Sequence, residues 1–454
     1  MHMFMGHKRK QPDGSLSIYR VARGFYGVPT AARGFSKVLR GVLDKSGAMR
    51  LHSARAMFRL LGEDAHLGNR VVGGTIVDDI LMEGPMPLLQ YMLKFLRTEF
   101  NGEMTHEFDP TAFGGHSLRR DWKRNALTLA IPEKVFAFAA LMGVSSDPKE
   151  NKKNFGPPAI TKDDIADMGF EDKTGKLDDD QKLVQKACGL GIWMSELRYD
   201  HKMYFRECAK FMARPKAAPA LKVLKALACS LVANPYGGVT FGGTPSPKTA
   251  YETTHSSKEL HTLPTRVFDI NRAGTDYAQV FDSTWGSLSC ASVGAEAHSF
   301  MNAAFAVHVK NVPGTPMSST QAEAYVQAGS MARGKGYFNL MIEMDLPVVL
   351  PIKVWGDNTS AEMLAKDAKT STACRHFMRR ISFMQDEVED GTFEPAHVPT
   401  SKNPVDMFGK LVNAAKYRES VNFLMNTVCE VSITDADRER ALKAYEEALI
   451  AMKL

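Results

Sequence analysis

Apolar and polar positions in the C-terminal half of the chain occur in short blocks that predict a mixed order of strands and helices. Five apolar segments have the length of strands, namely residues 277–281, 302–310, 314–318, 351–356 and 393–398. Residues 320–344, between the third and fourth of these, have apolar positions at helical spacing. The predicted order is therefore three strands, a helix, a strand, a helix, a strand and a helix.

Acidic residues stand at the ends or starts of four of these elements: Asp282, Glu323, Asp357 and Asp406. Asp282 and Asp357 each end an apolar run. Glu323 lies one turn inside the helix that Ser318 opens, and Asp406 lies just inside a helix introduced by Asn403 and Pro404. Carboxylates in such places can converge. Together they would bind two Mg²⁺ ions, which in nucleases activate a water and stabilise the leaving oxygen of a phosphodiester.

Each carboxylate taken alone also has an ordinary explanation. Acidic residues of soluble chains are commonly solvated, and an acid in the first turn of a helix, such as Glu323, stabilises the helix by interacting with its dipole. The prediction of a metal site therefore depends on the order of the elements and on the four acids taken together.

The residues around these acids form recognisable short segments. Asp282 stands three residues before Trp285, with Thr284 between them. Residues 318–323 read Ser-Ser-Thr-Gln-Ala-Glu, and residues 357–361 read Asp-Asn-Thr-Ser-Ala. Three further segments follow in order, at residues 388–391, 398–400 and 405–408.

In combination these segments resemble the ribonuclease H region of copia-type long-terminal-repeat retrotransposon Pol polyproteins. The order of the predicted elements is also that of the ribonuclease H fold. Two positions depart from the family pattern, because Thr284 replaces its second aspartate and Gln321 replaces its first glutamate. The resemblance implies that Asp282, Glu323, Asp357 and Asp406 are catalytic and bind Mg²⁺ or Mn²⁺.

Upstream segments resemble the reverse transcriptase of the same polyproteins. Residues 25–27, with Arg33 and Phe35, resemble a segment near its nucleotide site. Residues 77–81 resemble its hairpin with two metal-binding aspartates, here Asp78 and Asp79. The connecting region of the family is matched by residues 198–200, 211–215 and 220–231. The resemblance thus covers most of the chain and implies a remnant polymerase metal site at Asp78 and Asp79.

The polymerase half departs from the family in ways that predict no polymerase activity. A polymerase palm needs a third metal-binding aspartate well upstream of the hairpin, and no residue before Gly27 replaces it. Thr30, Ala32 and Ile76 stand where the family has Gln, Pro and Tyr. Losing a carboxylate that holds the metal removes most of the charge stabilisation of the transition state.

The resemblance implies a retrotransposon-derived Pol fragment that cleaves the RNA strand of RNA–DNA hybrids, with nucleic acid and other retroelement polypeptides as partners. Two alternatives remain open. One is a non-catalytic remnant that binds nucleic acid, and the other is a different nuclease or transposase on the same fold. The expected location is the cytoplasm, in a virus-like particle, or the nucleus, without secretion or a membrane.

Composition agrees with a folded multidomain protein and limits its chemistry. The 454 residues are 44% hydrophobic and 24% charged, enough apolar material for two or three cores. A formal net charge of +6 favours phosphate backbones only weakly. The six cysteines include no Cys-x-x-Cys pair, so neither a zinc site nor a disulfide framework is indicated.

Breaks in the pattern predict an α+β or α/β multidomain chain. A partial reverse-transcriptase palm and helical connection would precede a ribonuclease H-like domain with a mixed five-stranded sheet and helices. The predicted parts are a polymerase remnant at 1–144, a polar linker or insertion at 145–186, a helical connection at 187–233, a second linker at 234–264, the ribonuclease H-like domain at 265–425 and a helical tail at 426–454.

Several other residues near the predicted site could have either a structural or a functional role. His397 is taken as a structural or surface histidine. Trp285 and Trp355 could stack on a nucleic acid, but core packing is favoured for both. Arg375, Arg379 and Arg380 could form a basic helix face toward phosphates, and a solvated face explains them nearly as well.

Overall fold

The computed structural model describes residues 9–10, 16–17, 29–63, 70–76, 79–102, 104–151, 156–171, 175–243, 277–285, 291–346, 348–366 and 377–453. The chain divides into two compact units. The first consists of Met1–Gly114 with Asn339–Asp345, and the second of Gly115–Phe338 with Leu346–Leu454. Both units combine helices with sheets, which confirms the predicted mixed α+β class.

The first unit contains an antiparallel sheet of order β3-β4-β5-β6. Its elements are α1 Pro29–Lys45, β3 Met49–Arg50, β4 Met57–Leu61, β5 Arg70–Ile76, β6 Asp79–Glu83 and α2 Met86–Glu99, with the short strands β1 Arg9–Lys10, β2 Leu16–Ser17 and β7 Ala112–Phe113. Leu39 of α1, Phe58 of β4 and Met92 of α2 share one core. Helical spacing of Leu39, Val42 and Leu43 places them on the buried face of α1.

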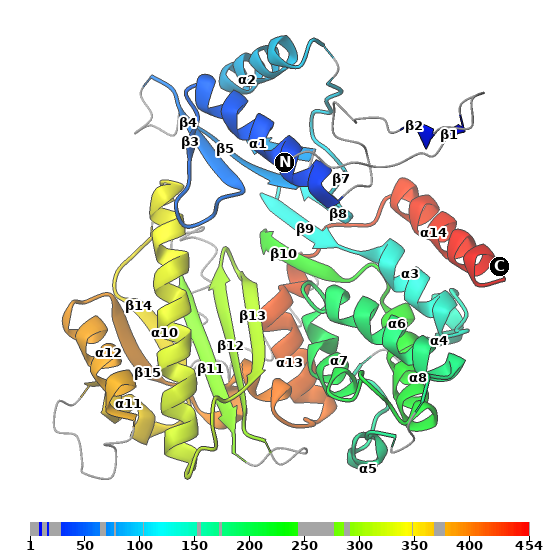
Figure 1. Ribbon diagram of the computed structural model, residues 1–454. Coiled ribbons are helices and arrows are strands. Elements are labelled where there is room, and N and C mark those ends of the chain that lie inside the picture. Colours follow the sequence, from blue (N-terminus) through cyan, green and yellow to red (C-terminus); the bar gives the residue numbers. More distant parts are fainter. Residues whose placement is uncertain are drawn as a thin grey trace. The chain divides into compact units, whose positions relative to one another are not determined.

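The second unit contains a five-stranded sheet of order β13-β12-β11-β14-β15 (Figure 1). Its strands are β11 Ala278–Thr284, β12 Val293–Phe300, β13 Ala303–Asn311, β14 Ile352–Gly356 and β15 Phe393–His397. The first three pair antiparallel in sequence order, whereas β14 pairs parallel with both β11 and β15. The C-terminal ends of β11, β14 and β15 therefore lie at the same edge of the sheet.

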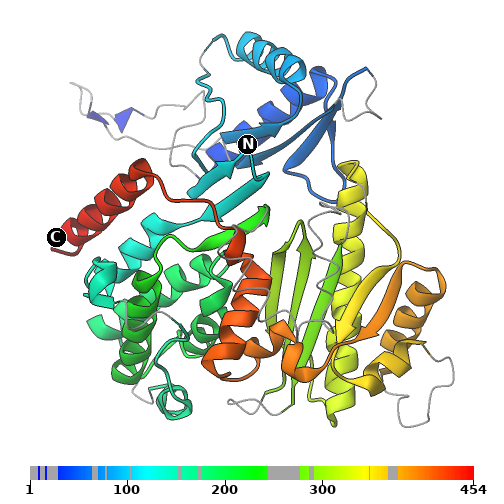
Figure 2. The ribbon, with the colours of Figure 1, turned by 180° about the vertical axis from the view of Figure 1, so that it is seen from behind.

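Helices cover both faces of this sheet. Helix α10, Ser319–Glu343, covers one face, where Ser330 donates a hydrogen bond to Gln279 of β11 at 2.9 Å. Figure 2 shows α13, Ala414–Met425, on the other face. There Val280 and Ala297 of the sheet share a core with α13 and with helices α6 Asp179–Met194, α7 Lys202–Ala209 and α8 Ala217–Ala233. These three helices are called the helical layer below. Successive strand residues thus point to two different buried layers.

The helical layer of the second unit packs beside a small antiparallel sheet in which β9 lies between β8 and β10. The remaining elements of the unit are β8 His116–Asp121, β9 Ala126–Ala130, α3 Pro132–Leu141, α4 Pro148–Asn151, α5 Lys162–Asp167, α6 Asp179–Met194, α7 Lys202–Ala209, α8 Ala217–Ala233, β10 Gly238–Gly242, α11 Thr359–Lys366, α12 Met378–Glu389 and α14 Asp435–Lys453. The predicted terminal helix is confirmed, and Tyr445 of α14 donates a hydrogen bond to the Val144 carbonyl at 3.1 Å. No helix in the described parts of the chain combines the length and apolar character that crossing a membrane requires.

Two of the predicted strands need correction. Residues 314–318 are not a strand, because Pro313 and Pro316 lack an N–H and Gly314 has a left-handed φ of 72°. The second strand is instead β12, which was missed because it is buried on both faces and contains polar residues such as Glu296 and His298. Residues 302–310 form a strand as predicted, but it is the third strand, β13. The strands at 277–281, 351–356 and 393–398 and the long helix are confirmed within a few residues.

The two predicted linkers also contain regular structure. Residues 145–186 include α5 and the start of α6, and Ile160, Ile165 and Met168 are buried in the core. These helices were not predicted because their apolar residues are few and widely spaced. Residues 234–264 include β10, which pairs with β9. Residues 187–233 and the five-stranded sheet belong to the same unit and share a core.

A buried ion pair between Arg198 and Asp200 stabilises the helical layer. Arg198 is 1% exposed, and its Nη2 lies 2.6 Å from Oδ2 of Asp200. Tyr417 of α13 donates a hydrogen bond to the Asp200 carbonyl at 3.1 Å. Burial alone would raise the pKa of Asp200, but Arg198 and His201 hold it below its usual value. The aspartate therefore stays ionised as the partner of Arg198.

Replacing Asp200 with Ala should destabilise the second unit strongly. The substitution leaves the Arg198 guanidinium buried without its counterion, which typically costs about 3–5 kcal/mol. Glu196→Ala is the matched control, because Glu196 pairs with Lys202 at 2.9 Å but its side chain is 70% exposed. Because the Glu196 carboxylate is largely in water, its loss should cost less than about 1 kcal/mol. Urea unfolding measures both losses, and equal losses would contradict the expectation.

Candidate metal centre

Three carboxylates from separate elements converge at the edge where β11 and β14 end. Asp282 lies near the end of β11, Asp357 directly follows β14, and Glu323 lies in the second turn of α10. Each offers a carboxylate oxygen, and these oxygens lie within 4.8 Å of one another. Parallel pairing of β11 with β14 brings the two aspartates to the same edge, and the N-terminal part of α10 adds the glutamate.

The three carboxylates lie mainly out of water. Asp282 is 6% exposed and Glu323 is 4% exposed, whereas Asp357 is half-buried. Burial, followed by the charges of Glu323 and Asp357, raises the pKa of Asp282 well above its ordinary value. Burial and the charge of Asp357 raise the pKa of Glu323 to about 8. Without a cation, the cluster therefore resists becoming fully ionised.

Glu323 is held by one oxygen and leaves the other without a partner. The backbone N–H of Ser283 donates to its Oε1 at 3.1 Å. Its Oε2 is buried and has no hydrogen-bond partner among the described residues. An unpartnered buried carboxylate oxygen costs free energy unless a cation or donor meets it. All the ligand atoms offered here are carboxylate oxygens, which suit Mg²⁺ or Mn²⁺.

The fourth predicted acid, Asp406, lies next to this cluster rather than within it. Asp406 is 5% exposed and lies just inside a helix that Asn403 and Pro404 introduce, as predicted, although this helix is the short 3-10 helix Pro404–Phe408. Asn403 caps this turn and also donates to the Phe281 carbonyl at 3.0 Å, which fixes the turn against β11. The charge of Asp406 contributes to the raised pKa of Asp282.

A lysine that the sequence did not single out accompanies Asp406. Lys410 Nζ lies 2.7 Å from Oδ1 of Asp406. Burial opposes the charged form of Lys410, but Asp406 and the cluster carboxylates raise its pKa overall. The pair follows i,i+4 spacing, which is the only sequence signal that could have suggested it. Lys410 thus offsets part of the negative charge at this edge.

The two positions that depart from the family pattern have defined places. Thr284 is the last residue of β11. Gln321 has a structural role at the start of α10, since its side chain accepts a hydrogen bond from the Met317 N–H at 2.8 Å. Its own N–H donates to Ser318 Oγ at 3.2 Å, which confirms Ser318 as the residue that opens the helix. Neither position adds a carboxylate to the cluster.

The remaining candidates lie elsewhere. Asp79 is exposed at the start of β6, paired in register with Ile76, while Asp78 and residues 25–27 lie outside the described residues. His397 is exposed at the end of β15. Trp355 is half-buried against the core, but the core position expected for Trp285 is wrong, because Trp285 is 57% exposed. Arg375 lies outside the described residues.

A second group of possible metal ligands was not predicted. Glu296 and His298 of β12 and His308 of β13 offer ligand atoms within 4.8 Å of one another. These residues are spaced along two strands and face α10, so no local motif marks them. Glu296 and His308 also line a pocket beside α10.

Comparison with known proteins identifies no relative of the chain. No protein-family model matches it, and no curated protein matches it. The functional conclusion therefore depends on the geometry of the carboxylates and on the residues around them.

Raising the pH should destabilise the metal-free protein through Glu323. Its pKa is about 8 when folded, against an ordinary value of 4.5, so between these values the folded state holds a proton that the unfolded state has released. Stability must then fall as the pH rises through this range. We expect a loss on the order of 2 kcal/mol between pH of about 5 and about 8.

Thermal unfolding in the presence of a chelator measures this loss. Glu323→Gln keeps the acceptor for Ser283 and should remove much of the pH dependence. Asp386→Asn, at an exposed position of α12, should leave it unchanged. If the unaltered protein and Glu323→Gln lose the same stability across this range, Glu323 is not the titrating group.

Proposed function

We propose that this chain is a metal-dependent ribonuclease H, derived from a copia-type retrotransposon Pol polyprotein, that cleaves the RNA strand of RNA–DNA hybrids. The observation that carries the proposal is the convergence of Asp282, Glu323 and Asp357 from three elements far apart in the sequence. The sheet order β13-β12-β11-β14-β15, with α10 between β13 and β14, supports a ribonuclease H fold. The short segments around these acids resemble those of copia-type retrotransposon Pol polyproteins, and this resemblance supports a retrotransposon origin.

The carboxylates of Asp282, Glu323 and Asp357 would hold Mg²⁺ or Mn²⁺, with Asp406 beside them. When bound, the metal ions would activate the attacking water and stabilise the charge of the leaving oxygen. Ser283 orients Glu323 through its backbone N–H. Burial of Asp282 and Glu323 keeps competing water away and strengthens their interaction with a cation. Lys410 holds Asp406 in place toward the cluster.

Substrate choice would follow the backbone of the hybrid rather than its base sequence. The carboxylates act on a phosphodiester, which every nucleotide shares. The 2′-hydroxyl of the cut strand and the shape of the hybrid are the features that separate RNA from DNA in such a site. Nucleic acid is accordingly the partner we propose, together with other retroelement polypeptides.

Cleavage of a labelled RNA–DNA hybrid tests the nuclease. With Mg²⁺ or Mn²⁺ the unaltered chain should cut the RNA strand. Asp282→Asn and Asp357→Asn should each lower the rate by at least about a hundredfold, because each removes charge that holds the metal. Both variants should fold, since removing a charge from a repulsive cluster does not weaken the core.

Asp386→Asn is the matched control, because it makes the same chemical change at an exposed position outside the cluster. It should cut at the unaltered rate. Cleavage that persists in Asp282→Asn and Asp357→Asn would show that another group, or a contaminant, performs the reaction.

The chain should not extend a primer. Asp79 belongs to no group of three metal-binding side chains among the described residues, and no residue before Gly27 replaces the third palm aspartate. A primer-extension assay with Mg²⁺ should therefore give no product above that of the Asp79→Asn variant. Magnesium-dependent DNA synthesis by the purified chain would overturn this expectation.

The Lys410–Asp406 pair favours a second candidate function, a remnant that binds nucleic acid without cutting it. Lys410 already partly neutralises the fourth acid, at 2.7 Å, and so reduces the charge left for a second metal ion. Thr284 and Gln321 have also lost the family's carboxylates. The two functions separate in the same assay, since the remnant would bind the hybrid and leave it intact with either metal.

A further inference from the structure

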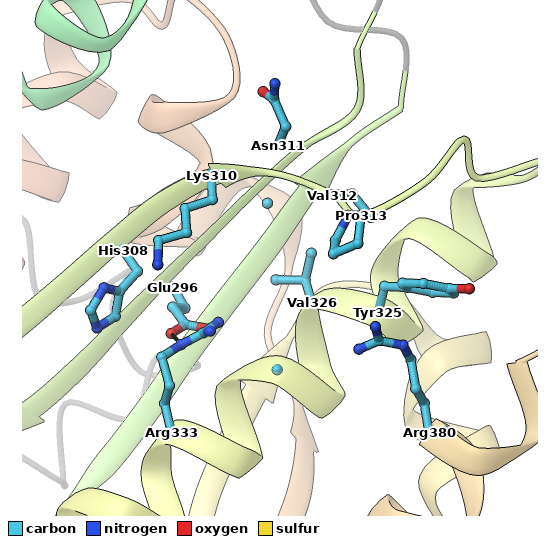
Figure 3. Close-up of a pocket in the computed structure, with 12 residues that line it drawn as sticks. Glu296, His308, Lys310, Asn311, Val312, Pro313, Tyr325, Val326, Arg333 and Arg380 are labelled. Carbon is cyan, nitrogen blue, oxygen red and sulfur yellow. Dashed lines mark hydrogen bonds and ion pairs between the residues drawn. The ribbon is translucent and has the colours of Figure 1, made fainter.

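A pocket of about 130 Å³ lies between α10 and the edge of the five-stranded sheet (Figure 3). Strands β12 and β13, helix α10 and Arg380 of α12 contribute to its walls. Its polar lining residues are Glu296, His308, Lys310, Asn311, Tyr325, Arg333 and Arg380. None of the predicted metal-binding acids lines it, so the pocket is distinct from the candidate metal centre.

Two glycines lie in the wall of the pocket. A Cβ at Gly329, in the middle of α10, would lie 3.1 Å from Nη2 of Arg333 and press on that guanidinium. Gly294 of β12 lies against Val326, with no room for a side chain between the strand and the helix. Glycine inside a helix costs stability, about 1 kcal/mol relative to alanine. Gly329 therefore leaves Arg333 uncrowded, at a cost to the intrinsic stability of α10.

The pocket carries a surplus of positive charge. Lys310, Arg333 and Arg380 are cations and Glu296 is the one carboxylate among its lining residues, so three positive charges against one negative leave two. Arg333 is paired with both oxygens of Glu296. Among the described residues, neither Lys310 nor Arg380 forms an ion pair with an acid, and Arg380 lies over the Tyr325 ring at 4.2 Å. Stacking on Tyr325 orients that guanidinium and leaves its N–H groups available.

The same charges argue against a metal ion at Glu296, His298 and His308. Arg333 occupies both carboxylate oxygens, and His298 is hydrogen-bonded to Glu296 and Tyr277 at 3.2 and 2.7 Å. His308 lies close enough to Arg333 and Lys310 for their charges to act with burial in lowering its pKa to about 4, and the same positive charges would repel a metal ion. A further cation would have to displace Arg333 and approach Lys310. An anion, in contrast, meets unpaired donors.

We propose that this pocket binds a phosphate group, held by Lys310, Arg333 and Arg380. The pocket volume of about 130 Å³ leaves room for a phosphate group. Arginine provides planar pairs of N–H donors that match phosphate oxygens, and lysine adds a mobile charge. The ligand is either a free phosphate or monoester, or a phosphodiester of a nucleic-acid backbone.

Titration of the full chain with inorganic phosphate, in chelator and at ionic strength matched with chloride, tests the proposal by calorimetry. The unaltered protein should bind phosphate saturably. Lys310→Gln and Arg380→Gln should each weaken binding about five- to tenfold, as expected for the loss of one charged donor. Lys310→Arg, which keeps the charge, should restore most of the affinity. Both positions are at least partly exposed, so these variants should fold.

Arg379→Gln is the matched control, because Arg379 is the exposed neighbour of Arg380 on α12 and does not line the pocket. It should bind phosphate as the unaltered chain does. The proposal is overturned if phosphate binding is not saturable, or if Arg379→Gln weakens it as much as Arg380→Gln does. Chelator keeps the carboxylate cluster out of this measurement, so failure here leaves the nuclease proposal standing, and the reverse also holds.

A short single-stranded DNA without terminal phosphates separates the two sources of ligand. If it displaces inorganic phosphate from the unaltered protein, the pocket accepts a backbone phosphodiester. If phosphate stays bound, the pocket takes a free phosphate or a monoester. Both results support an anion site in this pocket.

Discussion

Parallel pairing of β11 with β14 is the constraint on which the site depends. The register sets Ala278 opposite Lys353 and Val280 opposite Trp355, so both strands end at the same edge with their aspartates close together. A slip of one residue would move Asp357 by about 3.3 Å along the strand and turn its side chain to the other face. Helix α10 is fixed to the same sheet through Ser330 and Arg333, which sets the place of Glu323.

The buried carboxylates of the site lower the stability of the fold that surrounds them. Desolvation and mutual repulsion both disfavour the charged forms of Asp282 and Glu323, and one oxygen of Glu323 has no donor among the described residues. Lys410 pairs with Asp406 and offsets part of the charge of Asp282, but it does not cancel the rise in the pKa of Asp282. Functional groups often persist at such a cost because the surrounding packing holds them in place. Here that packing comes from a sheet covered on both faces.

The sequence predicted the elements whose signals are local and missed those that depend on distant partners. Ser318 opens α10 as expected, and β11, β14 and β15 follow short apolar runs. Strand β12 was missed because Glu296 and His298 are polar yet buried, and Arg333, which neutralises Glu296, lies 37 residues away. The four acids were found from their segments. The ion pair of Asp406 with Lys410 and the partial burial of Asp357 could be recognised only from the folded structure.

The shared core has a consequence for how this chain can be divided. Val280 and Ala297 of the sheet pack in the same cluster as Phe205 and Leu227 of the helical layer. A piece cut at residues 265–425 would keep α13 but lose α6, α7 and α8, and would expose part of this shared apolar core to water. The carboxylate edge therefore depends on helices that come far earlier in the chain than the sheet that bears it.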